Sequence, residues 1–76
     1  MMRVEKICAE VLGVPIDRLV DSQVLKELDS WDSLAHMILI TRIEDEFQIQ
    51  FTGDQIADIR TVGDIKTALN AVGAVV

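Results

Sequence analysis

The run from Ser33 to Phe47 most constrains what this chain can fold into, because it contains neither glycine nor proline. Large apolar residues recur through it at helical spacing, which predicts one uninterrupted helix. Asp32 and Ser33 are both residues that cap helices well. A serine in a first helical turn also lies where free backbone N–H groups and the positive end of the helix dipole favour an anion. These residues suit either a plain helix cap or a serine that carries a phosphate ester.

The predicted helix has two apolar faces when its residues are placed on a helical wheel. The stripe that we expect to face the core consists of His36, Leu39, Ile40, Ile43 and Phe47. The other side carries Leu34, Met37, Ile38 and Thr41, followed at the same angle by Glu44 and Asp45. A helix that is apolar all round is either buried on two sides or exposes a binding surface. We interpret the second face as a docking patch, with burial on both sides as the alternative.

The N-terminal part predicts a shorter helix followed by a long loop. One helical face of this first helix carries Val4, Ile7, Cys8, Val11 and Leu12. Gly13 and Pro15 should end the helix. Residues 14–31 have scattered apolar positions and no regular period, so we expect a loop that lies over the core, with a short helical turn near residues 17–19.

The C-terminal part predicts two more helices, each with a start signal. Residues 47–51 alternate as a strand would, but they have no convincing strand to pair with, so we expect an extended connection. Thr52 and Gln55 form a capping box for a short third helix that carries Ile56 and Ile59. Residues 61–64 cap a fourth helix, which Gly73 should end and whose stripe is Val62, Ile65, Leu69 and Val72. The predicted fold class is all-α, a small four-helix bundle with a long first loop and a short third helix.

Composition restricts the partners and the compartment. We expect one domain over residues 1–76. Thirteen acidic and seven basic residues give a net charge of −6, which disfavours nucleic acid and anionic membranes and favours basic patches on partner proteins. Cys8 is the single cysteine, so it cannot form an internal disulfide, and its place on the apolar stripe predicts a buried, unreactive thiol. The N-terminus lacks the apolar core of a signal peptide and the tail at 71–76 is too short to span a bilayer, so we expect a cytoplasmic protein. We also expect a monomer.

Catalytic and metal sites have little support in the sequence. His36 follows Ser33 by three residues, but no third group visibly orients it, so a hydrolase is disfavoured. The acidic residues do not follow the spacing of a calcium loop, and no cysteine and histidine cluster suits zinc. We expect no enzymatic activity and no bound metal.

The chain resembles the acyl carrier protein family along nearly its whole length. The resembling segments are Asp21-Ser22, Glu27-Leu28, Asp32-Ser33-Leu34, Ile43-Glu-Asp-Glu-Phe47 and Ile59-Arg-Thr-Val-Gly-Asp-Ile65. The resemblance implies that a phosphopantetheinyl transferase attaches 4'-phosphopantetheine from coenzyme A to Ser33. It implies that Asp32 supports this transfer and that Leu34 contacts partners. The arm would hold acyl groups as thioesters for acyl-loading and acyl-using biosynthetic enzymes, whose basic or apolar patches would meet the helix that begins at Ser33.

Departures from the family pattern bear on the pathway. The usual Leu-Gly-x-Asp-Ser approach is replaced by the longer Leu28–Ser33 segment without glycine. Ala35 and Ile38 stand where fatty-acid carriers often have acidic residues, and Arg42 adds a positive charge. These changes suggest a stand-alone carrier in a specialised biosynthetic pathway. The alternative is a non-enzymatic interaction domain with the same fold and no prosthetic group.

Two further expectations concern the arm and its cargo. Ser30 also follows an aspartate, but only Ser33 has a leucine after it and the family's spacing to Phe47. A long acyl chain, if it is sheltered, should lie among Leu39, Ile43 and Ile59.

Overall fold

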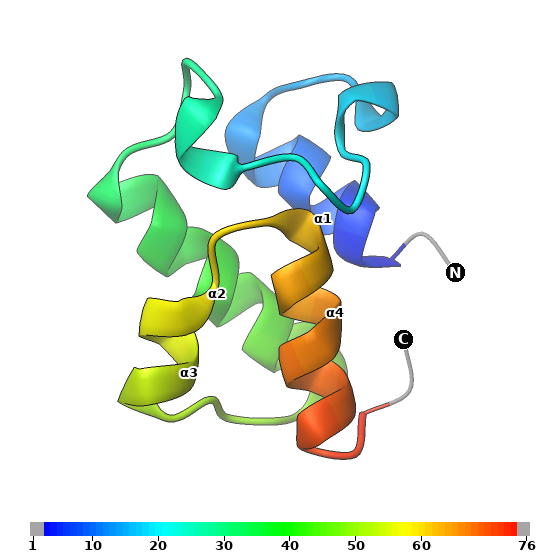
Figure 1. Ribbon diagram of the computed structural model, residues 1–76, viewed down its shortest axis with the longest axis vertical. Helices are drawn as coiled ribbons and strands as arrows, with labels where there is room; N and C mark the ends of the chain where they lie inside the picture. Colours follow the sequence, from blue (N-terminus) through cyan, green and yellow to red (C-terminus); the bar gives the residue numbers. More distant parts are fainter. Residues whose placement is uncertain (1–2, 75–76) are drawn as a thin grey trace.

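The computed structural model describes residues 3–74, and within them the fold is all-α, as predicted. Its elements are α1 (Arg3–Leu12), the 3₁₀ turns η1 (Ile16–Arg18) and η2 (Leu25–Glu27), α2 (Ser33–Phe47), α3 (Gly53–Asp58) and α4 (Val62–Ala71) (Figure 1). Residues 1–2 and 75–76, the outermost parts of the N-terminal segment and of the tail considered above, lie outside the described residues. No helix in the described part is both long and apolar enough to cross a bilayer.

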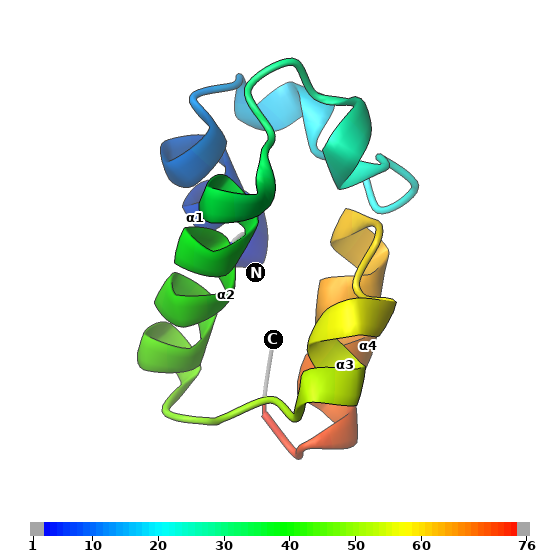
Figure 2. The ribbon, with the colours of Figure 1, turned by 90° about the vertical axis from the view of Figure 1, so that its left-hand side faces the viewer.

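The four helices form two pairs. Figure 2 shows α1 and α2 on one side and α3 and α4 on the other, with the loop that carries η1 and η2 across one end. The core between them is mostly aliphatic, because burying apolar surface is the dominant favourable term in folding and this chain has few aromatic residues. Its members are Val4, Ile7, Cys8, Leu12, Leu19, Leu25, Leu28, Leu39, Ile40, Ile43, Phe51, Ile59, Val62, Ile65 and Leu69. Three of them come from the first loop, so the prediction that this loop lies over the core is confirmed.

A lysine ties the first loop and α1 to α4. The Lys66 ammonium lies 2.5 Å from a Glu5 carboxylate oxygen and 2.6 Å from one of Asp21. Hydrogen bonds to Asp21 and to Glu5 raise the pKa of Lys66 above its ordinary value. The lysine therefore stays charged between two acidic side chains from separate segments.

Both predicted capping boxes are present. The Thr52 hydroxyl accepts a hydrogen bond from the Gln55 N–H, and the Gln55 side chain accepts one from the Thr52 N–H. Thr61 and Asp64 do the same at α4. A hydrogen bond from the Arg60 N–H, followed by those from Thr61, holds the pKa of Asp64 below its ordinary value. These local pairs begin the third and fourth helices where the sequence indicated.

Some predictions of burial and local structure were wrong in detail. Val72 was placed on the buried stripe of the fourth helix, but the helix ends at Ala71 and Val72 is 36% exposed. Val72 is the C-cap, and Gly73 follows it in a left-handed conformation with a φ of +82°. Gly73 therefore ends the helix as predicted, but the last helical residue is Ala71 and not Val72. His36 and Phe47 are only half-buried, because they lie at the ends of the core stripe of α2.

The first loop is more ordered than predicted. The expected turn near residues 17–19 is present as η1, one residue earlier, but η2 was not anticipated. Val24 and Thr61 also form an isolated antiparallel bridge, in which the Leu25 N–H donates to the Arg60 carbonyl at 2.8 Å. Residues 48–52 form no strand, and Gln48 ends α2 in the left-handed conformation with a φ of 55°.

At Gly63 the first loop lies so close to α4 that an added side chain would be crowded. Its N–H donates to the Asp21 carbonyl at 2.8 Å, and an added Cβ would lie 3.0 Å from that oxygen. We expect Gly63→Ala to lower the free energy of unfolding by about 1–3 kcal/mol, since it overpacks this contact. Gly53→Ala is the control, because nothing lies within 4 Å of its added Cβ. It should raise stability by up to about 1 kcal/mol. Urea unfolding measures both, and equal stability of the two variants would contradict this close approach.

Candidate functional site

The start of α2 separates the roles of Asp32 and Ser33. Asp32 has an extended backbone, and its carboxylate accepts a hydrogen bond from the Ala35 N–H at 2.7 Å, so Asp32 is the N-cap. Ser33 is the first residue of the helix and is exposed. Its hydroxyl forms no hydrogen bond with any of residues 3–74. The cap is therefore provided without Ser33, whose hydroxyl stays available at the positive end of the helix dipole.

Ser30 is engaged in a different way. Its hydroxyl donates to the carbonyl oxygen of Leu12 at 2.5 Å. Leu12 is the last residue of α1, and its carbonyl is one of those that a helix leaves without an internal partner. Ser30 therefore fastens the loop to the end of α1, whereas Ser33 has no such structural task.

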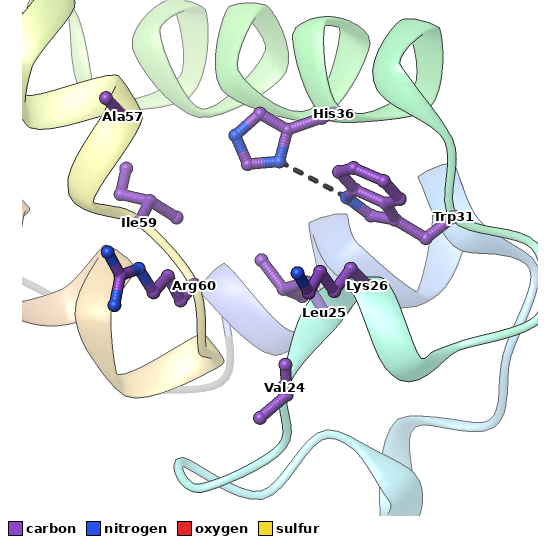
Figure 3. A pocket seen from close by; sticks show the side chains of 8 residues that line it. All are labelled: Val24, Leu25, Lys26, Trp31, His36, Ala57, Ile59 and Arg60. Atoms are coloured by element: carbon purple, nitrogen blue, oxygen red, sulfur yellow. Dashed lines mark hydrogen bonds between the residues drawn. The ribbon is translucent and has the colours of Figure 1, made fainter.

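His36 pairs with Trp31 and not with Ser33. The Trp31 Nε1–H donates to His36 Nδ1 at 3.3 Å, and the two rings meet edge to face with their centroids 5.7 Å apart (Figure 3). No hydrogen bond joins His36 to Ser33 in the described part of the chain, so the arrangement offers no base for a serine nucleophile. Residues 3–74 also hold no group of three or more side chains that could bind a metal ion.

A pocket of about 250 Å³ lies beside the N-terminal half of α2. Its lining residues are Val24, Leu25, Lys26, Trp31, His36, Ala57, Ile59 and Arg60 (Figure 3). They come from η2, from the residues around the start of α2 and from the end of α3. Ile59 lines this pocket, but Leu39 and Ile43, which were expected to shelter a cargo with it, are fully buried and are not on its wall.

The second face of α2 is exposed, as predicted. Leu34, Met37 and Ile38 are 69%, 51% and 47% exposed, and they are three of the five large exposed apolar residues of the described chain. The alternative of a helix buried on two sides is therefore wrong. Thr41 and Asp45 are also exposed, which extends this face with polar groups. We call Leu34, Met37, Ile38, Thr41 and Asp45 the outer face of α2.

Glu44 does not belong to that outer face. Its side chain is half-buried, and its carboxylate accepts a hydrogen bond from the Phe51 N–H at 2.8 Å. Glu44 therefore holds the connection after α2 against the helix. The helical wheel placed it with Asp45 because a wheel contains no information about where the following segment turns back.

Cys8 is fully buried, as expected from its place on the stripe of α1. Burial, with a smaller effect of Glu5, raises the pKa of its thiol to about 12. Such a thiol is protonated at neutral pH and has little nucleophilic character. The only sulfhydryl of this chain is therefore a core side chain.

Comparisons with known proteins agree with this arrangement. The family model described as "Phosphopantetheine attachment site" matches residues 3–69. An acyl carrier protein of Saccharopolyspora erythraea is 33% identical over 63 residues, which are 83% of this chain and 66% of that relative. The solved structure of a protein described as an acyl carrier protein, from Mycobacterium tuberculosis, has a TM-score of 0.80 and 33% identity. That similarity covers 91% of this chain and 92% of the other.

Proposed function

Because the chain belongs to the acyl carrier protein family, whose members are phosphopantetheine-bearing carriers and not enzymes, we propose that Ser33 is its attachment residue. One observation carries this proposal: Asp32 caps α2 by itself and leaves the Ser33 hydroxyl exposed and without a hydrogen bond in the described chain. Ser30 is the obvious competitor, and its hydroxyl is already bonded to Leu12. Of these two serines, Ser33 is therefore the one whose hydroxyl is free for modification.

The residues around Ser33 fit a phosphodiester. The first turn of a helix presents N–H groups that have no internal acceptor, and the helix dipole favours negative charge there. One Asp32 oxygen accepts from Ala35, while the second has no hydrogen bond within residues 3–74. We propose that this free oxygen supports the transfer of phosphopantetheine to Ser33, since it can help to place a metal-bound donor. When attached, the arm supplies a thiol that holds acyl groups as thioesters.

The outer face of α2 is the proposed docking surface. Interfaces concentrate their binding energy in a few apolar or aromatic anchors, and rim charges mainly steer the approach. Leu34, Met37 and Ile38 supply the anchors beside Ser33, while Thr41 and Asp45 form the rim. The proposed partners are a phosphopantetheinyl transferase and enzymes that load or use the acyl group. Glu44 is left out because it is bonded to Phe51.

A specialised, stand-alone role is also part of the proposal. Ile38 is half exposed where fatty-acid carriers often have an acidic residue, so its partners should offer an apolar pocket there. Arg42 forms an ion pair with Glu10 at 2.8 Å, so its charge is partly offset within the chain. The outer face is consequently more apolar than a strongly acidic recognition helix.

Intact mass spectrometry tests the proposed function. The unmodified chain, incubated with coenzyme A, Mg²⁺ and a broad-range phosphopantetheinyl transferase, should gain the mass of one phosphopantetheine. The control omits the transferase and should leave the mass unchanged. Absence of the gain with several transferases would favour an interaction domain without a prosthetic group.

A further inference from the structure

The only tryptophan and the only histidine of this chain meet across the proposed attachment residue. Trp31 lies two residues before Ser33, and His36 lies three residues after it. The Trp31 Nε1–H donates to His36 Nδ1 at 3.3 Å, and the two half-buried rings meet edge to face (Figure 3). This contact combines a hydrogen bond with a favourable aromatic geometry. The two side chains therefore join the end of the first loop to the beginning of α2.

The segment between these two rings carries the residues of the proposed transfer. The Asp32 carboxylate accepts a hydrogen bond from the Ala35 N–H at 2.7 Å, and its carbonyl accepts one from the His36 N–H at 2.9 Å. The Ser33 hydroxyl has no hydrogen bond with any of residues 3–74. The place of that hydroxyl therefore depends on the backbone on either side of it, which the Trp31 and His36 side chains hold together.

The stretch that leads to Ser33 has few other anchors. It is longer than the usual family approach and contains no glycine, and residues 28–32 form neither a helix nor a 3₁₀ turn. The Ser30 hydroxyl fastens its start to α1 through the bond to the Leu12 carbonyl. Toward α2, within residues 3–74, its side-chain hydrogen bonds come only from the Asp32 cap and the Trp31 indole. Loss of the indole bond would leave the cap alone to hold this end of the stretch.

The bond between the two rings requires one protonation state of the imidazole. Nδ1 accepts, so a neutral His36 ring carries its proton on Nε2. In a protonated imidazole both nitrogens are donors, so Nδ1 can no longer accept from Trp31. Histidine is the side chain that ordinarily changes its charge between about pH 5 and pH 8. The contact beside Ser33 is therefore made in the neutral form and lost in the charged form.

The charged groups near the imidazole come from three segments. Lys26 of η2 and Arg60, which follows α3, line the same pocket as His36, while α3 itself contributes the uncharged Ala57 (Figure 3). On α2, Asp32 lies about one turn before the histidine. Ordinary carboxylate, ammonium and guanidinium groups keep their charges between about pH 5.5 and pH 8. Among these groups, the imidazole is the one expected to change its charge in that range.

We propose that Trp31 and His36 are positioning residues for the modification of Ser33, and that this modification slows when His36 is protonated. The inference rests on the proposed function, and it goes beyond it by assigning two residues that act without touching the donor. In the transfer, the serine oxygen bonds to the pantetheine-side phosphorus of coenzyme A. The bond from that phosphorus to the bridging oxygen breaks, adenosine 3',5'-bisphosphate leaves, and the hydroxyl proton passes to water. Such a step is sensitive to placement, since an error of about 1 Å can lower a rate ~100-fold.

The pH profile of the transfer tests the pair. The kcat/KM of the transferase is measured by intact mass for the unmodified chain and for His36→Asn between about pH 5.5 and pH 8. Asparagine has an oxygen where histidine has Nδ1, so the variant keeps an acceptor that does not titrate. The ratio of the two values cancels the pH dependence of the transferase itself. We expect this ratio, unmodified chain over variant, to fall about fivefold from pH 8 to pH 5.5, as for the loss of one hydrogen bond.

Matched variants assign the effect to the bond between the rings. Trp31→Phe keeps an aromatic ring but removes the donor, so it should lower kcat/KM about fivefold at pH 8. Trp31→Phe combined with His36→Phe should lower it no further than either change alone, because the two residues share one bond. Thr67→Val is the control. It removes the hydrogen bond from the Thr67 hydroxyl to the Gly63 carbonyl on α4 and should leave both the rate and its pH profile unchanged.

The outcomes separate this inference from the proposed function. A ratio that stays constant with pH, or losses that add in the double variant, would overturn the positioning role while the mass gain still supports attachment at Ser33. A mass gain that is absent at every pH would overturn both.

A measurement on the unmodified protein tests the contact without the arm. Because the chain has one histidine and one tryptophan, the NMR signals of the imidazole and of the indole N–H are each unique. The neutral imidazole should carry its proton on Nε2, and the indole N–H signal should shift with the same pH midpoint as the imidazole. In His36→Asn the indole signal should stay constant over this range. A neutral ring with its proton on Nδ1, or an indole signal that does not follow the histidine titration, would overturn the inference.

Discussion

Replacing Ser33 by alanine should abolish the mass gain with coenzyme A and transferase completely. The hydroxyl is the group that would form the phosphodiester, and no other atom at this position can replace it. The fold should persist, because Asp32 caps α2 through Ala35 and alanine is a good helix former. We therefore expect a change in stability within about 0.5 kcal/mol, as is usual for an exposed position.

Ser30→Ala is the matched control and should show the reverse result. The mass gain should be retained, while loss of the bond to the Leu12 carbonyl should lower the free energy of unfolding by about 1 kcal/mol. Asp32→Asn refines the comparison, since asparagine caps as well as aspartate but lacks the charge. It should slow the transfer at unchanged melting temperature. Modification of Ser33→Ala, or loss of modification in Ser30→Ala, would contradict the assignment.

The two faces of α2 should respond to substitution in opposite ways. Ile43 is fully buried and Ile38 is 47% exposed. Ile43→Ala should lower the free energy of unfolding by about 2–5 kcal/mol, because it deletes buried methyl groups and leaves a cavity. Small domains have only about 5–15 kcal/mol in total, so this single change removes a large share of the stability.

Ile38→Glu should instead impair recognition. We expect kcat/KM of the transferase to fall about tenfold or more, since truncating or charging a central apolar anchor of an interface costs more than 1 kcal/mol. Circular dichroism and melting temperature should stay nearly unchanged. Asp45→Asn, at the rim, should mainly slow association and lose its effect at high salt. Unfolding of Ile38→Glu, or an unchanged transferase reaction, would contradict the docking role of the outer face.

The sequence by itself determined the helices of this protein and where three of them begin. Residues 33–47 form one helix because no glycine or proline interrupts their apolar spacing, and the pairs Thr52 with Gln55 and Thr61 with Asp64 start the next two. These interactions join residues three or four positions apart, so they are visible in the linear chain. The family resemblance could be read from the same linear order, and the comparisons confirm it.

Only the tertiary structure decided what each polar group does. Asp32 and Ser33 are equally good caps in the sequence, and the structure gives the cap to Asp32. The Glu44 carboxylate accepts a hydrogen bond from the Phe51 N–H, and the Ser30 hydroxyl donates one to the Leu12 carbonyl. Lys26 and Arg60 line one pocket although 34 positions separate them in the sequence. The path of the loops sets these partnerships, and that path depends on how the whole core packs. No local pattern encodes it, because the partners lie many residues apart and their side chains can bond equally well to water.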